Sequence, residues 1–248
     1  MKGIIMRKSL LIIATLIIIN SSVYPCFDTY LFLNKGSMVY PYKSAVLELT
    51  GEYSVNQFEN PHEDAFLSNG SFYYGLGEKF SFQLSLGSDE KSRDNFKLDF
   101  YSIKAVYNVH TSNLNDYTLD LMLQYRRGMN NTLDEIELSL PNIFRFSELT
   151  YVIHPVANYS VNDKNYQIGG HTGIFYDFNE SGVIGFGAEY ASPQSGSYAG
   201  ERITKSEVAA SIFLGAKIGN FLYVQNELAK GLSNSRDFGF ALTAKFLI

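Results

Sequence analysis

Residues 116–127 read DYTLDLMLQYRR, and apolar and polar side chains alternate along this stretch. Successive side chains of an extended strand point to opposite faces. One face of this strand would carry Tyr117, Leu119, Leu121, Leu123 and Tyr125, and the other would carry Thr118, Asp120, Met122, Gln124 and Arg126. The pattern therefore predicts a strand with one oily face, which is turned either into a protein core or out into lipid.

Segments of the same kind recur along the chain, separated by turn signals, and no sustained helical period appears after the first 25 residues. Their lengths of about 9–14 residues exceed the usual strand length of about 5–6 residues. They match the length that a tilted strand needs to cross a bilayer. About twelve strands are predicted, at residues 44–57, 66–76, 79–88, 95–109, 115–127, 133–140, 147–160, 165–178, 182–191, 206–218, 221–232 and 236–248.

The composition of the 248 residues fits a strand-rich protein, with 18 Tyr, 19 Phe and 20 Gly. A net charge of −5 gives no electrostatic footprint for nucleic acid. The single cysteine, Cys26, excludes an internal disulfide framework and a cysteine-based zinc site. No cofactor and no metal are predicted.

The faces of these strands favour lipid over a core. Nearly every strand has one continuous oily face, and aromatic residues such as Tyr117 and Tyr125 cap it, as in the interfacial girdles of membrane barrels. An open sheet edge in lipid would leave backbone polar groups unpaired, so the sheet must close. We therefore predict an all-β fold, a transmembrane antiparallel β-barrel of about twelve strands with its oily face outward. The alternative is a secreted β-sandwich or a lipocalin-like barrel, whose strands are usually shorter.

The first 25 residues have the pattern of a secretory signal peptide. Lys2, Arg7 and Lys8 precede an apolar run over residues 10–19, which is too short to span a bilayer. We predict a signal peptide over residues 1–25, a single barrel domain over 26–248 and export to the cell outer membrane. An uncleaved anchor and lipidation of Cys26 are the alternatives.

The lengths of the connections suggest an orientation, because outer-membrane barrels have short periplasmic turns and longer external loops. With both ends of the chain in the periplasm, the periplasmic connections would be GEK, HTSNLN, PNIFRF, NES and GN. The longest connection, SPQSGSYAGERITK, would lie outside.

Several segments resemble a known family. FYYGLGEKFSFQLSLG (72–87), LDEIELSLPN (133–142), GGHTGIFYDFNESGVIGFGAEY (169–190) and ELAKGLSNSRDFGFALTAKF (227–246) are similar in order and character to the transporter-like outer-membrane barrels of the phenol-degradation-pathway family. The resemblance covers roughly residues 44–248. It implies a barrel of about twelve strands with a transport role, and it supplies no catalytic residues. The chain departs from such barrels in ending KFLI, where an aromatic last residue is usual.

One short motif suggests an enzymatic function as a hypothesis. His110 and Ser112 in HTSN (110–113) are two residues apart, as in outer-membrane phospholipases and lipid A deacylases, and the histidine could activate the hydroxyl. The motif falls in a predicted periplasmic turn, however, and no orienting carboxylate follows on the next strand. We therefore predict no catalytic residues and no enzyme activity, with a lipid hydrolase as a lesser alternative and turn residues as the simpler interpretation.

Two histidines and one glycine-rich run are candidates for other chemistry. His154 and His171 lie on the predicted inner faces of neighbouring strands, where they could bind a metal or sense protons, but a polar interior network is the simpler interpretation. The glycines of residues 182–191 alternate with Ile184 and Phe186 and precede no helix. They are typical of a strand rather than a phosphate loop.

The predicted function is that of a channel or transporter-like barrel for small solutes or hydrophobic compounds, and the alternative is a non-conducting structural or surface-binding barrel. The expected partners are membrane lipids, the barrel-assembly machinery and a small-molecule solute, with no nucleic acid. Charges of both signs on the inner face would line a pore or pair across it. The predicted pore-lining residues are Lys104, Asp120, Gln124, Arg126, Glu135, Glu137, His154, His171, Asp177, Glu189 and Lys217, and Lys245 lies on the same face.

Overall fold

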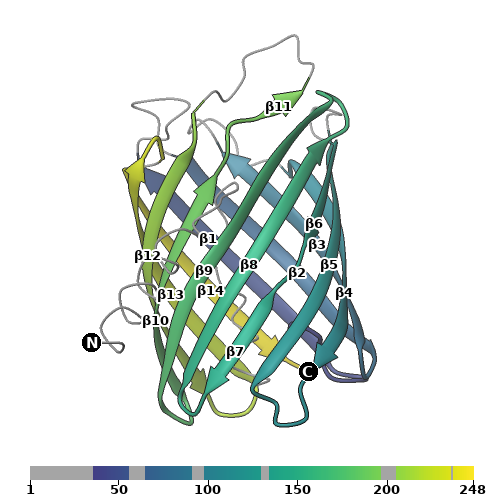
Figure 1. Ribbon diagram of the computed structural model, residues 1–248, viewed down its shortest axis with the longest axis vertical. Helices are drawn as coiled ribbons and strands as arrows, with labels where there is room; N and C mark the ends of the chain where they lie inside the picture. The colour runs from purple at the N-terminus through teal and green to yellow at the C-terminus, as the bar shows by residue number, and fades with distance from the viewer. Residues whose placement is uncertain (1–35, 56–64, 91–97, 130–133, 197–204, 236) are drawn as a thin grey trace, which may run out of the picture.

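The computed structural model describes residues 36–55, 65–129 except 91–97, 134–196, 205–235 and 237–248. Their strands form one closed antiparallel barrel of twelve strands (Figure 1). The strands are β1 (Ala45–Val55), β2 (Ala65–Gly77), β3 (Phe80–Glu90), β4 (Phe100–Thr111), β5 (Tyr117–Gly128), β6 (Asp134–Ser139), β7 (Asn142–Phe146), β8 (Leu149–Ser160), β9 (Asn165–Asn179), β10 (Gly182–Ala191), β11 (Ser195–Gly196), β12 (Glu207–Ile218), β13 (Leu222–Ser233) and β14 (Phe238–Leu247). Across these described ranges, no helix is long and apolar enough to cross a membrane.

The barrel closes where its first and last strands meet. β1 pairs with β14 from Val46 opposite Leu247 to Val55 opposite Phe238. Every other strand of the wall pairs with its neighbours in chain order, and the backbone N–H of Ile248 donates to the carbonyl of Ala45 at 2.9 Å. The wall thus has no free edge, as lipid requires, and the predicted all-β barrel is confirmed.

The fourteen labelled elements make twelve crossings of the barrel wall, because two crossings consist of more than one element. β6 and β7 together form one crossing, because both pair with β5 and β8 and they are interrupted only at Leu140 and Pro141. β11 is a two-residue extension that pairs with the start of β9. The predicted strand positions agree closely with the twelve crossings.

The prediction that PNIFRF (141–146) is a connection was wrong. Residues 142–146 form β7, and the turn comes at Ser147 and Glu148, where Ser147 has a φ of 58°. Pro141 has no N–H to donate to the sheet, so it interrupts the hydrogen bonding without reversing the chain. Its carbonyl still accepts from the N–H of Asp120 at 3.0 Å.

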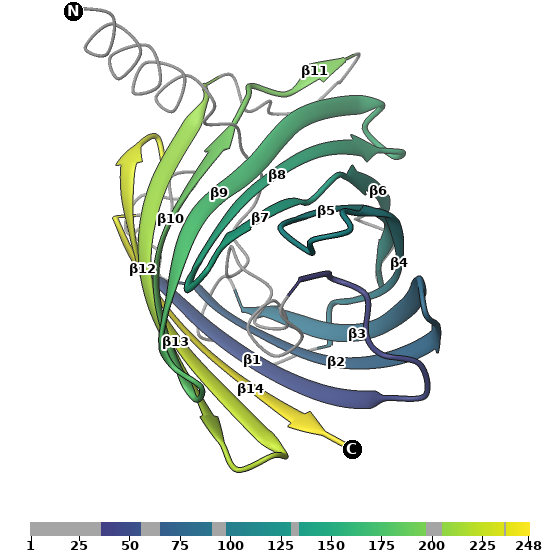
Figure 2. The same cartoon turned by 60° about the horizontal axis from the view of Figure 1, so that its bottom comes forward.

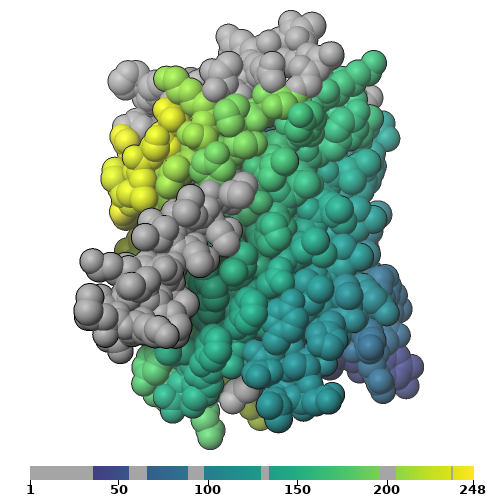
Figure 3. Space-filling view, in the orientation of Figure 1, coloured from purple at the N-terminus to yellow at the C-terminus, as the bar shows by residue number. Residues whose placement is uncertain are grey.

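The outer face is apolar and the inner face is polar, which answers the question raised by residues 116–127. Leu49, Leu84, Ile103 and Leu123 are each about half exposed on the outside. Lys245, also on a strand, has no exposure at all. Side chains of adjacent strands meet over the visible outer wall (Figure 3).

Aromatic side chains form two rims around this apolar wall. We call the end with the turns at 78–79, 112–116, 147–148, 180–181 and 219–221 the short-turn end, and the opposite end the long-loop end. Two such rims mark the bilayer interfaces of membrane barrels. Exposed members are Phe80, Tyr107, Phe146, Tyr176, Phe178 and Phe221 at the short-turn end, and Tyr53, Phe66, Tyr159, Tyr166 and Phe238 at the long-loop end.

Candidate functional site

The candidate site is the interior of the barrel, where the predicted pore-lining residues come together in rows across the strands. Directly opposed residues of an antiparallel pair place their side chains on the same face. The register joins Lys104, Gln124 and Glu137 in one row. A second row holds Arg126 and Glu135. The alternation of residues 116–127 thus identified this face of β5 correctly.

The remaining predicted residues also lie on the inner face. His154 pairs with His171, which pairs in turn with Glu189. Asp177 is opposite Val183, and Lys217 is opposite Tyr223, and both of these partners are buried.

The row of Arg126 contains a long ion pair. Its Nη1 lies 4.0 Å from Oε2 of Glu135, and its guanidinium lies 3.8 Å from the centre of the Phe100 ring. The ring contact brings the cation close to an aromatic face, which is favourable where water is scarce. Arg126 is therefore held flat against the wall near the long-loop end.

A segment of chain before β1 lies inside the barrel, and we call residues 36–40 the inner segment. Met38, Val39 and Tyr40 are almost fully buried, although no strand includes them. Figure 2 shows this part of the chain leading into β1 within the ring of strands. The inner segment therefore occupies part of the lumen near the short-turn end.

Asp120 anchors one end of the inner segment. Its carboxylate accepts from the N–H of Met38 at 2.6 Å, from Oγ of Ser37 at 3.0 and 3.1 Å, and from Nδ2 of Asn108 at 2.8 Å. Hydrogen bonds to a carboxylate are among the stronger ones. Asp120 thus faces inward as predicted, and its carboxylate is covered by the inner segment.

Lys245 and Glu48 anchor the other end. The Lys245 ammonium lies 2.9 Å from Oε2 of Glu48 and donates to the hydroxyl oxygen of Tyr40 at 3.1 Å. The hydroxyl of Tyr73 donates to the same Glu48 oxygen at 3.0 Å, and the rings of Tyr40 and Tyr73 lie 4.5 Å apart. A buried ion pair needs such extra hydrogen bonds to offset the loss of water.

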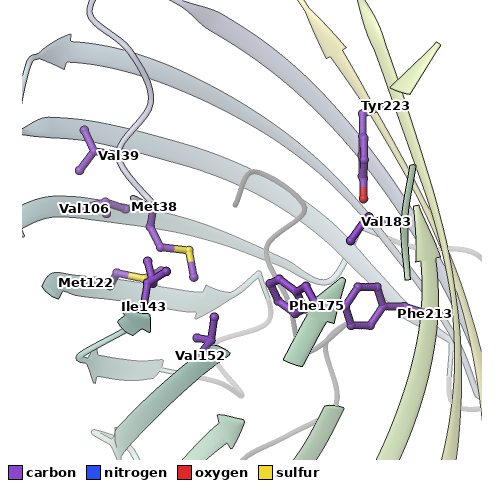
Figure 4. Close-up of a cluster of buried hydrophobic side chains, with 10 residues drawn as sticks. All are labelled: Met38, Val39, Val106, Met122, Ile143, Val152, Phe175, Val183, Phe213 and Tyr223. Atoms are coloured by element: carbon purple, nitrogen blue, oxygen red, sulfur yellow. The ribbon is translucent and has the colours of Figure 1, made fainter. Parts of the chain in front are cut away.

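Apolar side chains also pack together inside the barrel. Met38 and Val39 belong to one buried cluster with Met122 and Ile143 (Figure 4). On the far side of the cluster the rings of Phe175 and Phe213 meet edge to face at 5.1 Å. The complete cluster is Met38, Val39, Val106, Met122, Ile143, Val152, Phe175, Val183, Phe213 and Tyr223.

Sequence reasoning missed the inner segment, Tyr40 and Tyr73. The sequence GSMVY (36–40) has no alternation or charge pattern that would place it inside a barrel. Glu48 could have been found, because it alternates with Leu47 and Leu49 in the predicted first strand. Its ion pair with Lys245 follows only from the closure of β1 on β14.

The predicted hydrolase motif is not assembled as a catalytic pair. The Ser112 hydroxyl donates to a carboxylate oxygen of Asp116 and accepts from the N–H groups of Asp116 and Tyr117, so it caps its own turn. His110 is exposed at the end of β4, with its ring 6.1 Å from that of Tyr117. Residues 182–191 form strand β10, as expected of a strand rather than a phosphate loop.

Comparison with known proteins shows which solved structures have a similar fold. No family model matches the chain, and no curated protein matches it. A COG4313 outer membrane channel from Pseudomonas putida F1 has 12% identity and a TM-score of 0.65, covering 92% of this chain and 100% of that one. The NanC porin has 10% identity and a TM-score of 0.62, covering 81% and 98%.

A third similar structure is the KdgM porin in complex with disordered oligogalacturonate, with 12% identity, a TM-score of 0.58 and coverage of 81% and 98%. At these identities the likeness shows the fold alone, which is that of outer-membrane channel barrels. The phenol-degradation name of the predicted family is not confirmed by any of these comparisons and stays a prediction.

Proposed function

We propose that this protein is an outer-membrane channel that gives small solutes or hydrophobic compounds a passive route through a narrow lumen. The observation that carries the proposal is the reversed polarity of a closed wall, with lipid-facing leucines outside and charged rows inside. Lys104, Gln124, Arg126, Glu135, Glu137, His154, His171, Asp177, Glu189 and Lys217 line the route in this proposal. Asp120 contributes by holding the inner segment that narrows it.

The charges of the inner face suggest which solutes the channel favours. Among the described strands, carboxylates outnumber cations on this face, and rings of acidic side chains favour cations in channels. The KdgM porin was solved with oligogalacturonate, which is a polyanion, and the balance of charge here does not suit such a solute. We therefore propose small cationic or neutral solutes. The carboxylates are Glu48, Glu52, Asp120, Glu135, Glu137, Asp177, Glu189, Glu207 and Glu227, and the cations are Lys104, Arg126, Arg145, Lys217 and Lys245.

Single-channel recording in planar bilayers tests the proposal. We expect small, resolvable conductance steps from the wild type and larger steps from Asp120→Ala, because Ser37 and Met38 lose their acceptor and the inner segment no longer narrows the lumen as tightly. Leu121→Ala is the matched control, since Leu121 follows Asp120 on the same strand but faces outward. Silence from both the wild type and Asp120→Ala, with both folded, would favour the non-conducting barrel.

The location in the outer membrane and the partners form part of the same proposal. A chain with a lipid-facing wall needs export, for which residues 1–25 are the proposed signal peptide, and insertion by the barrel-assembly machinery. Residues 1–25 lie outside the described residues. Sequencing the mature N-terminus from an outer-membrane fraction checks the cleavage site, and a mass increase on the mature chain would instead support lipidation of Cys26.

We propose no enzymatic role. The Ser112 hydroxyl is committed to its turn, so phospholipid hydrolysis by the purified protein should not exceed the background. If hydrolysis is observed and is lost in Ser112→Ala, the lipid hydrolase alternative replaces the channel.

A further inference from the structure

Two histidines stand side by side on the inner wall, one on each of two neighbouring strands. His154 of β8 and His171 of β9 are direct partners in the register, and their ring centres are 5.4 Å apart with an angle of 59° between the planes. The next inward residues of β9, Gly169 and Gly173, have no side chain. No side chain of β9 therefore stands immediately beside the His171 ring on this face.

Each ring has a nitrogen without a hydrogen-bond partner. Nε2 of His154 and Nδ1 of His171 are both buried, and no donor or acceptor of the described chain reaches either atom. Buried polar atoms are nearly always hydrogen-bonded, so two orphaned nitrogens on adjacent rings need an explanation. The rings are not bonded to each other through these atoms. A lone pair on an imidazole nitrogen is the commonest protein ligand for transition metals.

We propose that His154 and His171 bind one divalent transition-metal ion, with Cu²⁺ preferred over Zn²⁺. Imidazole nitrogens suit both ions, and copper forms the stronger complexes of the first-row divalent metals. A metal–nitrogen distance of about 2.0–2.1 Å puts the ion roughly 3 Å from each ring centre. A separation of 5.4 Å between the centres then gives a nitrogen–metal–nitrogen angle of roughly 110–120°.

Water would occupy the other coordination positions of the metal. A carboxylate would lie behind one of the ligating histidines. Nowhere in the described ranges does a group of three His, Cys, Asp or Glu side chains form a ready metal cage. The site is thus a two-imidazole site rather than a closed structural one. Glu189 is the register partner of His171 on β10, and a carboxylate beside a ligating histidine orients the ring and raises its basicity.

Copper titration of the refolded barrel in detergent, followed by electron paramagnetic resonance, tests the site. We expect one Cu²⁺ per barrel, with hyperfine coupling to two imidazole nitrogens. His154→Ala and His171→Ala should each weaken binding by about tenfold or more and leave one coupled nitrogen. Glu189→Gln should weaken binding less, with both nitrogens retained.

The two other histidines provide the controls, since the chain has four. His62→Ala and His110→Ala should leave the signal unchanged, and heat-dependent gel mobility should show that every variant is folded. The proposal is overturned if the folded double variant His154→Ala/His171→Ala binds Cu²⁺ as tightly as the wild type, or if the wild type binds none. The measurement needs no conduction, so its outcome is independent of the channel proposal.

Discussion

Lys245 is fully buried, as Asp120 is, and its environment explains how a lysine can lie inside a lumen. One carboxylate, one phenol oxygen and two aromatic rings surround its ammonium, which lies 5.0 Å from the centre of the Tyr73 ring. Removing one partner of a buried ion pair costs more than the pair contributes, because the other charge is left uncompensated.

We expect Lys245→Met to lower the free energy of unfolding by about 3–5 kcal/mol, since Glu48 keeps only the Tyr73 hydroxyl. The double variant Lys245→Met/Glu48→Gln should recover part of that loss, because no bare charge remains. Denaturant unfolding in lipid vesicles, arranged as a double-mutant cycle, measures both. Equal losses in the single and the double variant would contradict the role given to the ion pair.

Individual inner residues were predictable only where alternation placed them. The inward direction of Lys104, Gln124 and Glu137 follows from counting every second residue along each strand. The contact of Asp120 with Met38 could not be predicted, because it joins residues 82 positions apart through a segment without a pattern. The alternation gives the face of a side chain, but its partners depend on the three-dimensional path.

At the scale of one strand, β5 has an apolar face toward lipid and a polar face toward the interior. Leu123 is about half exposed on the lipid side, and Gln124, the next residue, faces inward beside Lys104 and Glu137. The two positions lie at nearly the same height in the wall. The same substitution at the two positions should therefore differ in its effect on stability only through the environment of each face, lipid outside and polar side chains inside.

We expect Leu123→Arg to destabilise the folded barrel by about 2–4 kcal/mol, as arginine does on the lipid face near the middle of a bilayer. Gln124→Arg is the matched control and should cost much less, because its charge enters a polar row. Reversible unfolding from vesicles gives both values. A larger loss for Gln124→Arg than for Leu123→Arg would mean that the faces are assigned the wrong way round.

The twelve crossings were predictable from the sequence because each has a clear period of two. The β6–β7 crossing was predicted too short, since Pro141 looks like the end of a strand. In the structure the chain continues in the same direction, and neighbouring strands hold it on both sides. A proline interrupts the hydrogen bonding of a strand. The strand resumes here because residues 142–146 pair with β5 and β8.

At the scale of the whole molecule, the inner wall sets the electrical character of the proposed channel. Carboxylates outnumber cations on the inner face of the described strands, and the Glu135 and Glu137 carboxylates lie side by side toward the long-loop end. A fixed excess of negative charge raises the local concentration of small cations.

We expect a KCl gradient across a planar bilayer to give a reversal potential of the sign that marks a preference for K⁺ over Cl⁻. Glu135→Gln/Glu137→Gln should move the potential toward zero. Asp134→Asn is the matched control, because Asp134 lies on the outer face between the same strands. An anion-selective wild type would contradict the proposed solute class.

The closed barrel itself was predictable, because apolar faces of this length need lipid and lipid forbids open edges. The position of the inner segment in its short-turn half was not predictable, since the sequence predicts which strand side chains face inward and not what lies between them. The apolar cluster around Met38 brings residues from distant strands together across the lumen, and no local pattern records that meeting.

The pairing of β14 with β1 has a consequence for how the protein matures. Lys245 sits on β14, which is the last strand of the wall to be synthesised, while Tyr40 and Glu48 emerge from the ribosome some 200 residues earlier. A partly inserted sheet therefore lacks the ammonium that donates to Tyr40, and until the final hairpin docks the inner segment has its Asp120 anchor without its Lys245 anchor. Completion of the wall and full anchoring of the inner segment become a single event.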